Sequence, residues 1–202
     1  MFSHLHVHSW FSFQSGVSSP DVLCRAAAAR GFTSLACTDT NGVYGAVDFQ
    51  QTALAHGLQP ILGAHLVDGS QETLALAMDQ QGWAALCRAI TAIHWKEEAG
   101  ADFSLAAQLG HDREGLLLLS ADSAFLEQVA RASGPRDLYA ELRPGKERHL
   151  VAAAARMLQV PTVVTGAVMF ANPEEWQTHR LRVAIAANAA ISSLGETGTG
   201  AG

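Results

Sequence analysis

Residues 2–9 read FSHLHVHS, an apolar stretch in which His6 and His8 stand two positions apart. Side chains two apart on an extended strand share a face, so the two imidazoles would project side by side. Two imidazoles at a strand end can share one divalent metal, and imidazole is a common ligand for zinc, iron and nickel. Because the chain holds nine histidines, surface or internally hydrogen-bonded histidines stay open as the alternative.

The composition indicates one folded domain. Of the 202 residues, 49% are hydrophobic and 16% charged, which supplies a large core and argues against disorder. No apolar run reaches the ~18 residues of a membrane span, and we expect no secretory signal. The three cysteines lie in apolar contexts without a C-x-x-C motif, which is typical of buried, reduced thiols in a cytoplasmic protein.

The charge balance bears on nucleic-acid binding. Thirteen basic residues against nineteen acidic ones give a formal charge of −6, and no Lys/Arg cluster is present. Affinity for DNA depends largely on neutralising phosphates, so we expect weak direct DNA binding.

Short apolar runs alternate with longer stretches of helical period. The predicted strands are residues 2–8, 33–38, 59–67, 73–78, 115–120, 138–142 and 160–165; the predicted helices are 20–30, 46–56, 83–94, 124–132, 145–158 and 174–187. Buried strands separated by helices predict a parallel sheet covered by helices. About seven such units favour closure into a barrel, with an open doubly wound sheet as the alternative.

Metal-ligating side chains follow several predicted strands, where the chemistry of parallel barrels collects. Asp39 could join the histidine pair, or its carboxylate could instead begin the turn through residues 40–42. His65 ends the third strand, as a ligand or as a hydrogen-bonded rim residue. Asp122 follows the run GLLLLSA, where capping of the next helix is an equally good interpretation. His94 ends a predicted helix.

Several segments occur in a familiar order. LHVHSWFSFQSG (5–16), LACTDTNGVYGAVDF (35–49) and PILGAHL (60–66) resemble the opening of the PHP (polymerase and histidinol phosphatase) domain, as found at the start of the bacterial DNA polymerase III alpha subunit and its error-prone relatives. The likeness continues through GWAALCRAIT (82–91), GLLLLS (115–120), DLYAELRPG (137–145) and residues 160–185. We therefore expect a PHP domain over residues 1–190 and a flexible tail over 191–202.

The resemblance implies an α/β fold, a distorted (β/α)7 TIM-like barrel. In active members, two or three metal ions at the strand ends hydrolyse phosphoesters. By position, His6 and His8 match the first-strand ligand pair and Asp39 matches the second-strand carboxylate. His94 falls near a further histidine of the family.

This sequence also departs from the family pattern at several ligand positions. Thr40 stands where the family has a histidine, His65 where it has a bridging glutamate, and Asp122 where it has a cysteine. Ala167 and Met169 replace the aspartate and histidine of the last strand, and neither can donate an oxygen or imidazole ligand. A full metal cluster is therefore not expected.

The residues that we expect at the metal site are His6, His8, Asp39, His65, Asp122 and His94. They would hold at most one or two divalent ions, zinc or manganese, or none. We hypothesise a structural module of a replicative or error-prone polymerase system, without polymerase activity of its own. Its partners would be a polymerase body or another translesion subunit, and a proofreading exonuclease. The alternative hypothesis is an active phosphoesterase (3′–5′ exonuclease or phosphatase) with a reduced metal site.

Overall fold

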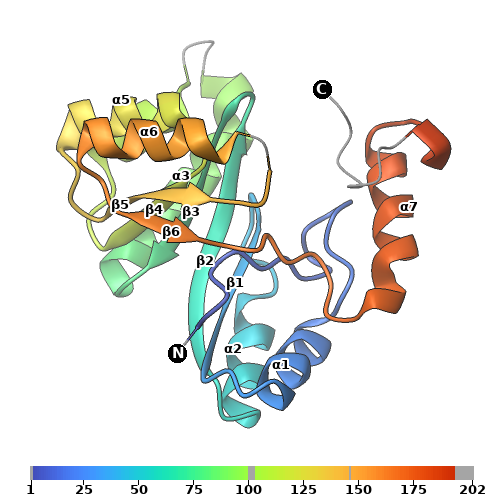
Figure 1. Ribbon diagram of the computed structural model, residues 1–202. Helices are drawn as coiled ribbons and strands as arrows, with labels where there is room; N and C mark the ends of the chain where they lie inside the picture. The colour runs from blue at the N-terminus through green and yellow to red at the C-terminus, as the bar shows by residue number, and fades with distance from the viewer. Residues whose placement is uncertain (1, 100–102, 146, 194–202) are drawn as a thin grey trace.

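The computed structural model describes residues 2–99, 103–145 and 147–193 and shows a curled sheet with helices packed around it (Figure 1). The strands are β1 (Ser34–Thr40), β2 (Gln59–Asp68), β3 (Gln71–Ala77), β4 (Leu116–Ser120), β5 (Leu138–Leu142) and β6 (Thr162–Val164). The helices are α1 (Pro20–Ala29), α2 (Ala46–Ala55), α3 (Gln80–Ala99), α4 (Leu105–His111), α5 (Ser123–Ser133), α6 (Arg148–Leu158) and α7 (Trp176–Ala186), with 3-10 turns η1 (Pro173–Glu175) and η2 (Ile191–Ser193). Within these ranges no helix is both long and apolar enough to cross a membrane.

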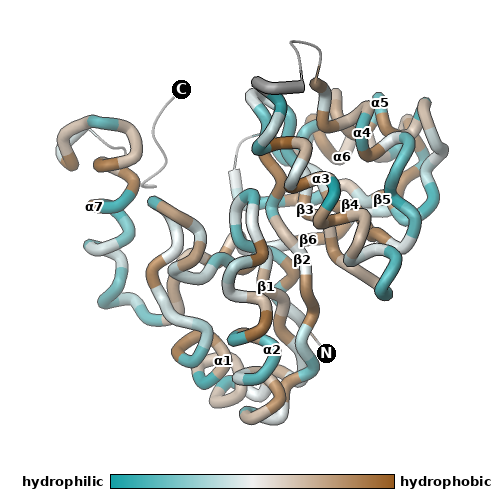
Figure 2. The backbone as a smooth tube through the Cα atoms, turned by 180° about the vertical axis from the view of Figure 1, so that it is seen from behind, coloured by the Kyte–Doolittle hydropathy of each residue, from teal (hydrophilic) through white to brown (hydrophobic). Residues whose placement is uncertain are grey.

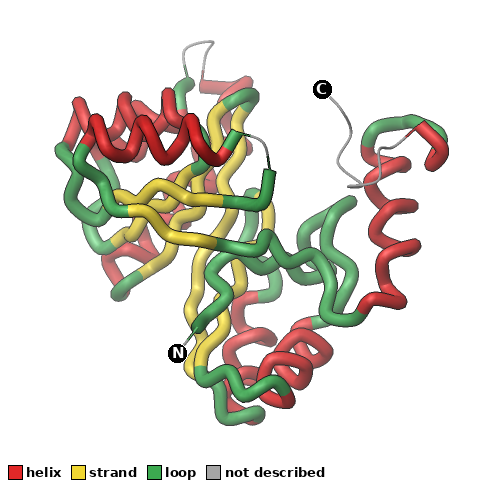
Figure 3. The backbone as a smooth tube through the Cα atoms, viewed as in Figure 1, coloured by secondary structure: helices red, strands yellow, loops and turns green. Residues whose placement is uncertain are grey.

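The strands form one six-stranded sheet in the order of the chain. β1 pairs with β2, β4 with β5 and β5 with β6 in parallel, whereas β3 runs antiparallel to both of its neighbours. The prediction of a parallel sheet is therefore wrong at β3. Figure 3 shows the strands curling into a half-barrel, and the described residues form this half-barrel rather than a closed seven-stranded barrel.

A two-residue hairpin explains the direction of β3. Asp68 pairs with Gln71, so Gly69 and Ser70 alone connect β2 to β3. A loop this short joins antiparallel strands only, because parallel strands need a crossover of a dozen residues or more. Gly69 has a φ of +58°, as the first central position of a type II′ turn requires. The Gly-Ser pair is the sequence signal for this hairpin.

The N-terminal segment does not form the regular strand expected over residues 2–8. It makes isolated bridges from His4 to Leu35 and from Val7 to Val168. The backbone N–H of Val7 donates to Oγ1 of Thr38 at 2.9 Å instead of to a carbonyl, which interrupts a regular ladder. The segment still links β1 to the chain that follows β6, and this fixes the position of the histidine pair.

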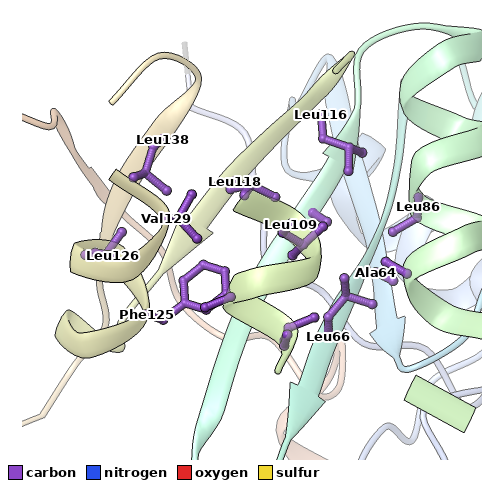
Figure 4. Packing of buried hydrophobic residues seen from close by; sticks show 14 of the residues in the cluster. Ala64, Leu66, Leu86, Leu109, Leu116, Leu118, Phe125, Leu126, Val129 and Leu138 are labelled. Carbon is purple, nitrogen blue, oxygen red and sulfur yellow. The ribbon is translucent and has the colours of Figure 1, made fainter. Parts of the chain in front are cut away.

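Two clusters of buried side chains lie on the outer face of the sheet. One packs α3, α4, α5 and α6 against the strands and includes Leu66, Leu86, Leu118 and Phe125 (Figure 4). The other packs α1 and α2 against β1 and includes Phe49. Each fully buried side chain of this size stabilises the fold by roughly 1.5–3 kcal/mol.

Alternate residues of the strands face the inside of the curl. Leu74, Leu76 and Leu119 form an inner cluster, whereas Ala75 and Leu118, their neighbours in sequence, belong to the outer one. This alternation is the two-residue period of extended chain. It also decides which polar residues at the strand ends point inward.

The helices begin close to the predicted positions where their caps are visible in the sequence. Ser19 caps α1, with Pro20 at the first helical position, as expected. α4 was not predicted; Ser104 caps it, and its Leu109 belongs to the outer core. Residues 191–193 of the predicted tail form η2, and the rest of that tail lies outside the described residues.

α7 stands apart from the sheet and alternates hydrophilic and hydrophobic stretches (Figure 2). It contacts the loop after His8: Nδ1 of His179 lies 2.8 Å from the carbonyl oxygen of Ser15, and Arg182 donates to the carbonyl of Gly16 at 2.5 Å. These bonds attach α7 to the segment that also carries the first candidate ligands.

Candidate metal centre

Strand parity places a histidine and a glutamate inside the curl. On β2, His65 lies between Ala64 and Leu66, which both belong to the outer core. On β5, Glu141 follows Ala140, another outer-core residue. His65 and Glu141 therefore face inward, toward the same end of the sheet.

The histidine pair lies against His65. One ring nitrogen from each of His6, His8 and His65 falls within 4.8 Å of the others, so these three side chains could hold one ion. The Nε2 atoms of His6 and His8 are 2.9 Å apart. Both side chains are 1% exposed, and His65 is 13% exposed. The arrangement is thus a buried tri-histidine group that opens to solvent at His65.

Each imidazole has a hydrogen-bond partner on one ring nitrogen. The pairs are His6 Nδ1 with Glu141 Oε1 at 2.6 Å, His8 Nδ1 with Ser12 Oγ at 2.8 Å, and His65 Nε2 with Glu72 Oε2 at 3.1 Å. Partners of this kind fix the orientation of a ring, and they are typical of histidines that bind metal ions.

The two glutamates share one arginine. Thr165 donates to Oε1 of Glu141 at 2.5 Å, and Nε of Arg143 lies 3.5 Å from its Oε2. The same guanidinium forms an ion pair with Glu72. Because Glu141 is 3% exposed, these contacts compensate for the desolvation of its charge.

Both carboxyl groups favour the ionised form. Burial alone would raise the pKa of Glu141, but the hydrogen bond from His6 and the charge of Arg143 outweigh it and lower the pKa. Burial would likewise raise the pKa of Glu72, yet its bonds to His65 and Arg143 lower that pKa to about 2. The site therefore holds two acceptor carboxylates at neutral pH.

The buried imidazoles favour the neutral form. Burial lowers the pKa of His6, although Glu141 opposes the shift. Burial and the neighbouring His6 and His65 lower the pKa of His8 well below its ordinary value. Neutral imidazole is the form that ligates a metal ion, so binding here requires no proton to be displaced from His8 at pH 7.

Asp39 lies next to the tri-histidine group but is not part of it. Its carboxylate accepts hydrogen bonds from the N–H and the hydroxyl of Ser9, both at 2.7 Å, from Ser12 Oγ at 2.6 Å and from Cys37 Sγ at 3.3 Å. It reaches His8 only through Ser12. These bonds hold the loop after the first histidines rather than the turn through residues 40–42.

Asp122 and His94, also expected at the metal site, lie outside the group as well. Oδ1 of Asp122 accepts the backbone N–H groups of Ala124 and Phe125 and thereby caps α5. His94 is exposed, and its Nε2 lies 2.7 Å from the carbonyl oxygen of Asn41. The contacts of Asp122 are therefore those of a helix cap.

The chain after β6 has an unusual backbone at Ala167, one of the two positions where the family resemblance places a ligand. Ala167 has a φ of +46°, in the left-handed region that costs a residue with a Cβ roughly 1–2 kcal/mol. Its neighbour Val168 bridges Val7, and the carbonyl of Met169 accepts the N–H of Val17 at 3.0 Å. Aspartate tolerates this conformation better than alanine does.

Sequence reasoning missed Glu141, Glu72 and Ser12 as parts of the site. A charged residue inside the buried strand LYAEL is the one local signal for Glu141. Glu72 gives no such signal, because its position depends on the β2–β3 hairpin. Ser12 could be linked to Asp39 only once the loop after His8 was placed.

The fold is that of the PHP-type phosphoesterases. It matches a two-domain protein of Bacteroides vulgatus that contains a predicted PHP-like metal-dependent phosphoesterase, with a TM-score of 0.59, 11% identity, and coverage of 83% of this chain and 51% of that one. At this identity the likeness concerns the fold alone. Residues 4–160 match the PHP domain family, and the chain belongs to that family.

DNA polymerases are among the proteins similar to this chain in sequence. The error-prone DNA polymerase of Symbiobacterium thermophilum is 37% identical over 89% of this chain and 20% of its own length. The DNA polymerase III subunit alpha of Buchnera aphidicola is 29% identical over 91% of this chain and 18% of its own. The chain thus spans about a fifth of the length of these relatives.

Proposed function

We propose that this chain is a structural and interaction module of a DNA polymerase III alpha-like system, replicative or error-prone, with a reduced metal site. The observation that carries the proposal is the ligand group itself. Among the described residues it consists of His6, His8 and His65 and contains no carboxylate. Asp39 and Asp122 are bound elsewhere, which leaves too few donors for a cluster of two or three ions.

The remaining donors suit a single ion. Three imidazoles form a donor set that zinc accepts, and a divalent cation held there would act as a Lewis acid toward a phosphate oxygen. His6 and His8 would hold it from the buried side and His65 from the exposed side.

The role as an interaction module is supported by the relatives, in which a domain of this kind is a fifth of a longer polymerase. In addition, α7 exposes Leu181 (47%) and Ile185 (63%), one helical turn apart. We propose a polymerase body or another translesion subunit as the partner, together with a proofreading exonuclease, in the cytoplasm.

A hydrolysis assay tests the reduced activity. The purified chain is incubated with single-stranded DNA and with a chromogenic phosphodiester, with added Mn²⁺ or Zn²⁺, beside His8→Ala. We expect the two proteins to give the same background rate. Robust turnover that His8→Ala abolishes would overturn the proposal and establish the second candidate, an active phosphoesterase that uses the tri-histidine group. The retained partners of all three imidazoles favour that candidate.

A variant that restores two ligands tests why the metal site is reduced. The double variant Ala167→Asp/Met169→His puts back the donors that the family resemblance assigns to the last strand. We expect it to bind at least one more equivalent of metal than the parent chain. The control Met157→His/Ala187→Asp makes the same replacements at exposed positions and should leave the stoichiometry unchanged. Unchanged stoichiometry in the restored variant would show that these positions do not explain the reduction.

A further inference from the structure

The hydrogen bonds of the first histidine pair determine where their protons lie. The Ser12 hydroxyl has one proton, which it donates to Oδ1 of Asp39 at 2.6 Å. Toward His8 it can therefore only accept, so the proton of that ring is on Nδ1, which also lies 3.4 Å from Oγ1 of Thr40. The N–H of Thr40 fills the remaining acceptor position of the hydroxyl at 3.1 Å.

The same reasoning applies to His6. Oε1 of Glu141 accepts from Thr165 and lies 2.6 Å from Nδ1 of His6, so this nitrogen carries the proton. When both rings are neutral, Nε2 of His6 and Nε2 of His8 are the unprotonated nitrogens, and they face each other at 2.9 Å. Two ring nitrogens at this distance can share a proton or a metal ion, and the third imidazole beside them favours the metal ion.

The third imidazole follows the same rule. Nε2 of His65 lies 3.1 Å from a carboxylate oxygen of Glu72, whose other oxygen is paired with Arg143. Nε2 thus donates to Glu72, which leaves Nδ1 as the nitrogen that would ligate an ion. A separate carboxylate stands behind each imidazole: Glu141 directly, Glu72 directly, and Asp39 through the Ser12 hydroxyl.

We propose that Glu141, Glu72 and the Asp39–Ser12 pair are positioning residues for a mononuclear tri-histidine centre that selects zinc over magnesium and manganese. The inference rests on the proposed single-ion site and assigns Asp39 a position behind Ser12 instead of a place among the ligands. Zinc accepts an all-imidazole donor set, whereas magnesium and manganese prefer oxygen ligands. Loss of a carboxylate behind a ligating histidine typically weakens metal binding about 10–100-fold.

Titration of the metal-free chain with Co²⁺, a spectroscopic substitute for Zn²⁺, tests the inference. The visible absorption of tetrahedral cobalt reports affinity and stoichiometry without any need for enzyme activity. We expect one equivalent to bind, to be displaced by Zn²⁺, and not to be displaced by excess Mg²⁺. Glu141→Gln and Ser12→Ala should each weaken binding by about 10-fold or more.

The control is Glu175→Gln, which removes a carboxylate bonded to Ser18 and to the backbone N–H groups of residues 171 and 172. It should leave the Co²⁺ affinity unchanged, because its role is structural only. Near-UV circular dichroism of each metal-free variant separates altered binding from unfolding. If Ser12→Ala does not fold, Glu141→Gln carries the test.

Three results would overturn the inference: no Co²⁺ bound by the parent chain, unchanged affinity in both Glu141→Gln and Ser12→Ala, or Asp39→Asn abolishing binding while Ser12→Ala keeps it. The last result would make Asp39 a direct ligand. These three results concern metal binding and not hydrolysis, so each of them would leave the proposed structural role standing. Conversely, robust turnover would contradict the proposed structural role but not the assignment of Glu141, Glu72 and the Asp39–Ser12 pair as positioning residues.

Discussion

Asp122 offers a direct comparison between a structural and a ligand role for one carboxylate. Its Oδ1 accepts the N–H of Ala124 at 2.9 Å and that of Phe125 at 3.2 Å, at the first turn of α5. Asp122→Ala leaves both N–H groups to solvent, whereas Asp122→Ser keeps an oxygen that can accept them. The two variants therefore separate the capping contact from the negative charge.

The two lost capping contacts determine how much stability Asp122→Ala should lose. Replacing an N-cap side chain by alanine costs about 0.5–2 kcal/mol. Since two N–H groups lose their acceptor here, we expect a loss of about 1.5 kcal/mol from the free energy of unfolding. For a chain of 202 residues this lowers Tm by roughly 3–6 °C. Asp122→Ser should lose only a few tenths of a kcal/mol, through the missing charge at the helix N-terminus.

Urea unfolding followed by far-UV circular dichroism measures both variants, and Co²⁺ titration of the same preparations measures metal binding. We expect unchanged Co²⁺ affinity in Asp122→Ser. A stable Asp122→Ser protein that no longer binds Co²⁺ would refute the capping account and make Asp122 a ligand. A loss below about 0.3 kcal/mol in Asp122→Ala would refute the assigned magnitude.

Further predictions concern the surface, the core, a helix end and a thiol. With a net charge of −6, the chain should bind single-stranded DNA weakly at physiological salt, and a sub-micromolar Kd by fluorescence anisotropy would contradict this. Phe125→Ala removes a side chain that is 0% exposed and should cost about 3–5 kcal/mol by urea unfolding; a loss below 1 kcal/mol would mean that the site is poorly packed. Gln159, the C-cap of α6, has a left-handed backbone (φ +56°) that glycine adopts without strain. Gln159→Gly should therefore raise the free energy of unfolding by about 0.5–1 kcal/mol, and a lower Tm would contradict this prediction. Burial raises the pKa of Cys24 to about 11, so at pH 8 its thiolate fraction is about 100-fold below that of an ordinary thiol. Ellman's reagent should therefore modify Cys87, which is only partly buried, before Cys24. Faster reaction at Cys24 would show that its thiol is not buried.

Local patterns in the sequence were sufficient for most helices and strands. α1 begins at the predicted Ser19-Pro20 cap, and β5 has the predicted bounds, because caps and apolar periods act over a few residues. The direction of β3 was predictable in principle from Gly69-Ser70. The irregular first segment was not, since the hydroxyl of Thr38, 31 residues away, interrupts its ladder.

The sequence alone predicts that His6 and His8 lie together, because side chains two positions apart on extended chain point to the same side whatever surrounds them. It also named His65 as a candidate. Only the tertiary structure decided which carboxylates lie behind these rings: Glu141 comes from a strand 135 residues from His6, and Asp39, on β1, reaches His8 through Ser12 of the loop that follows His8. Hydrogen bonds of this kind depend on distances of a few tenths of an ångström between distant segments, and no local pattern of residues encodes them.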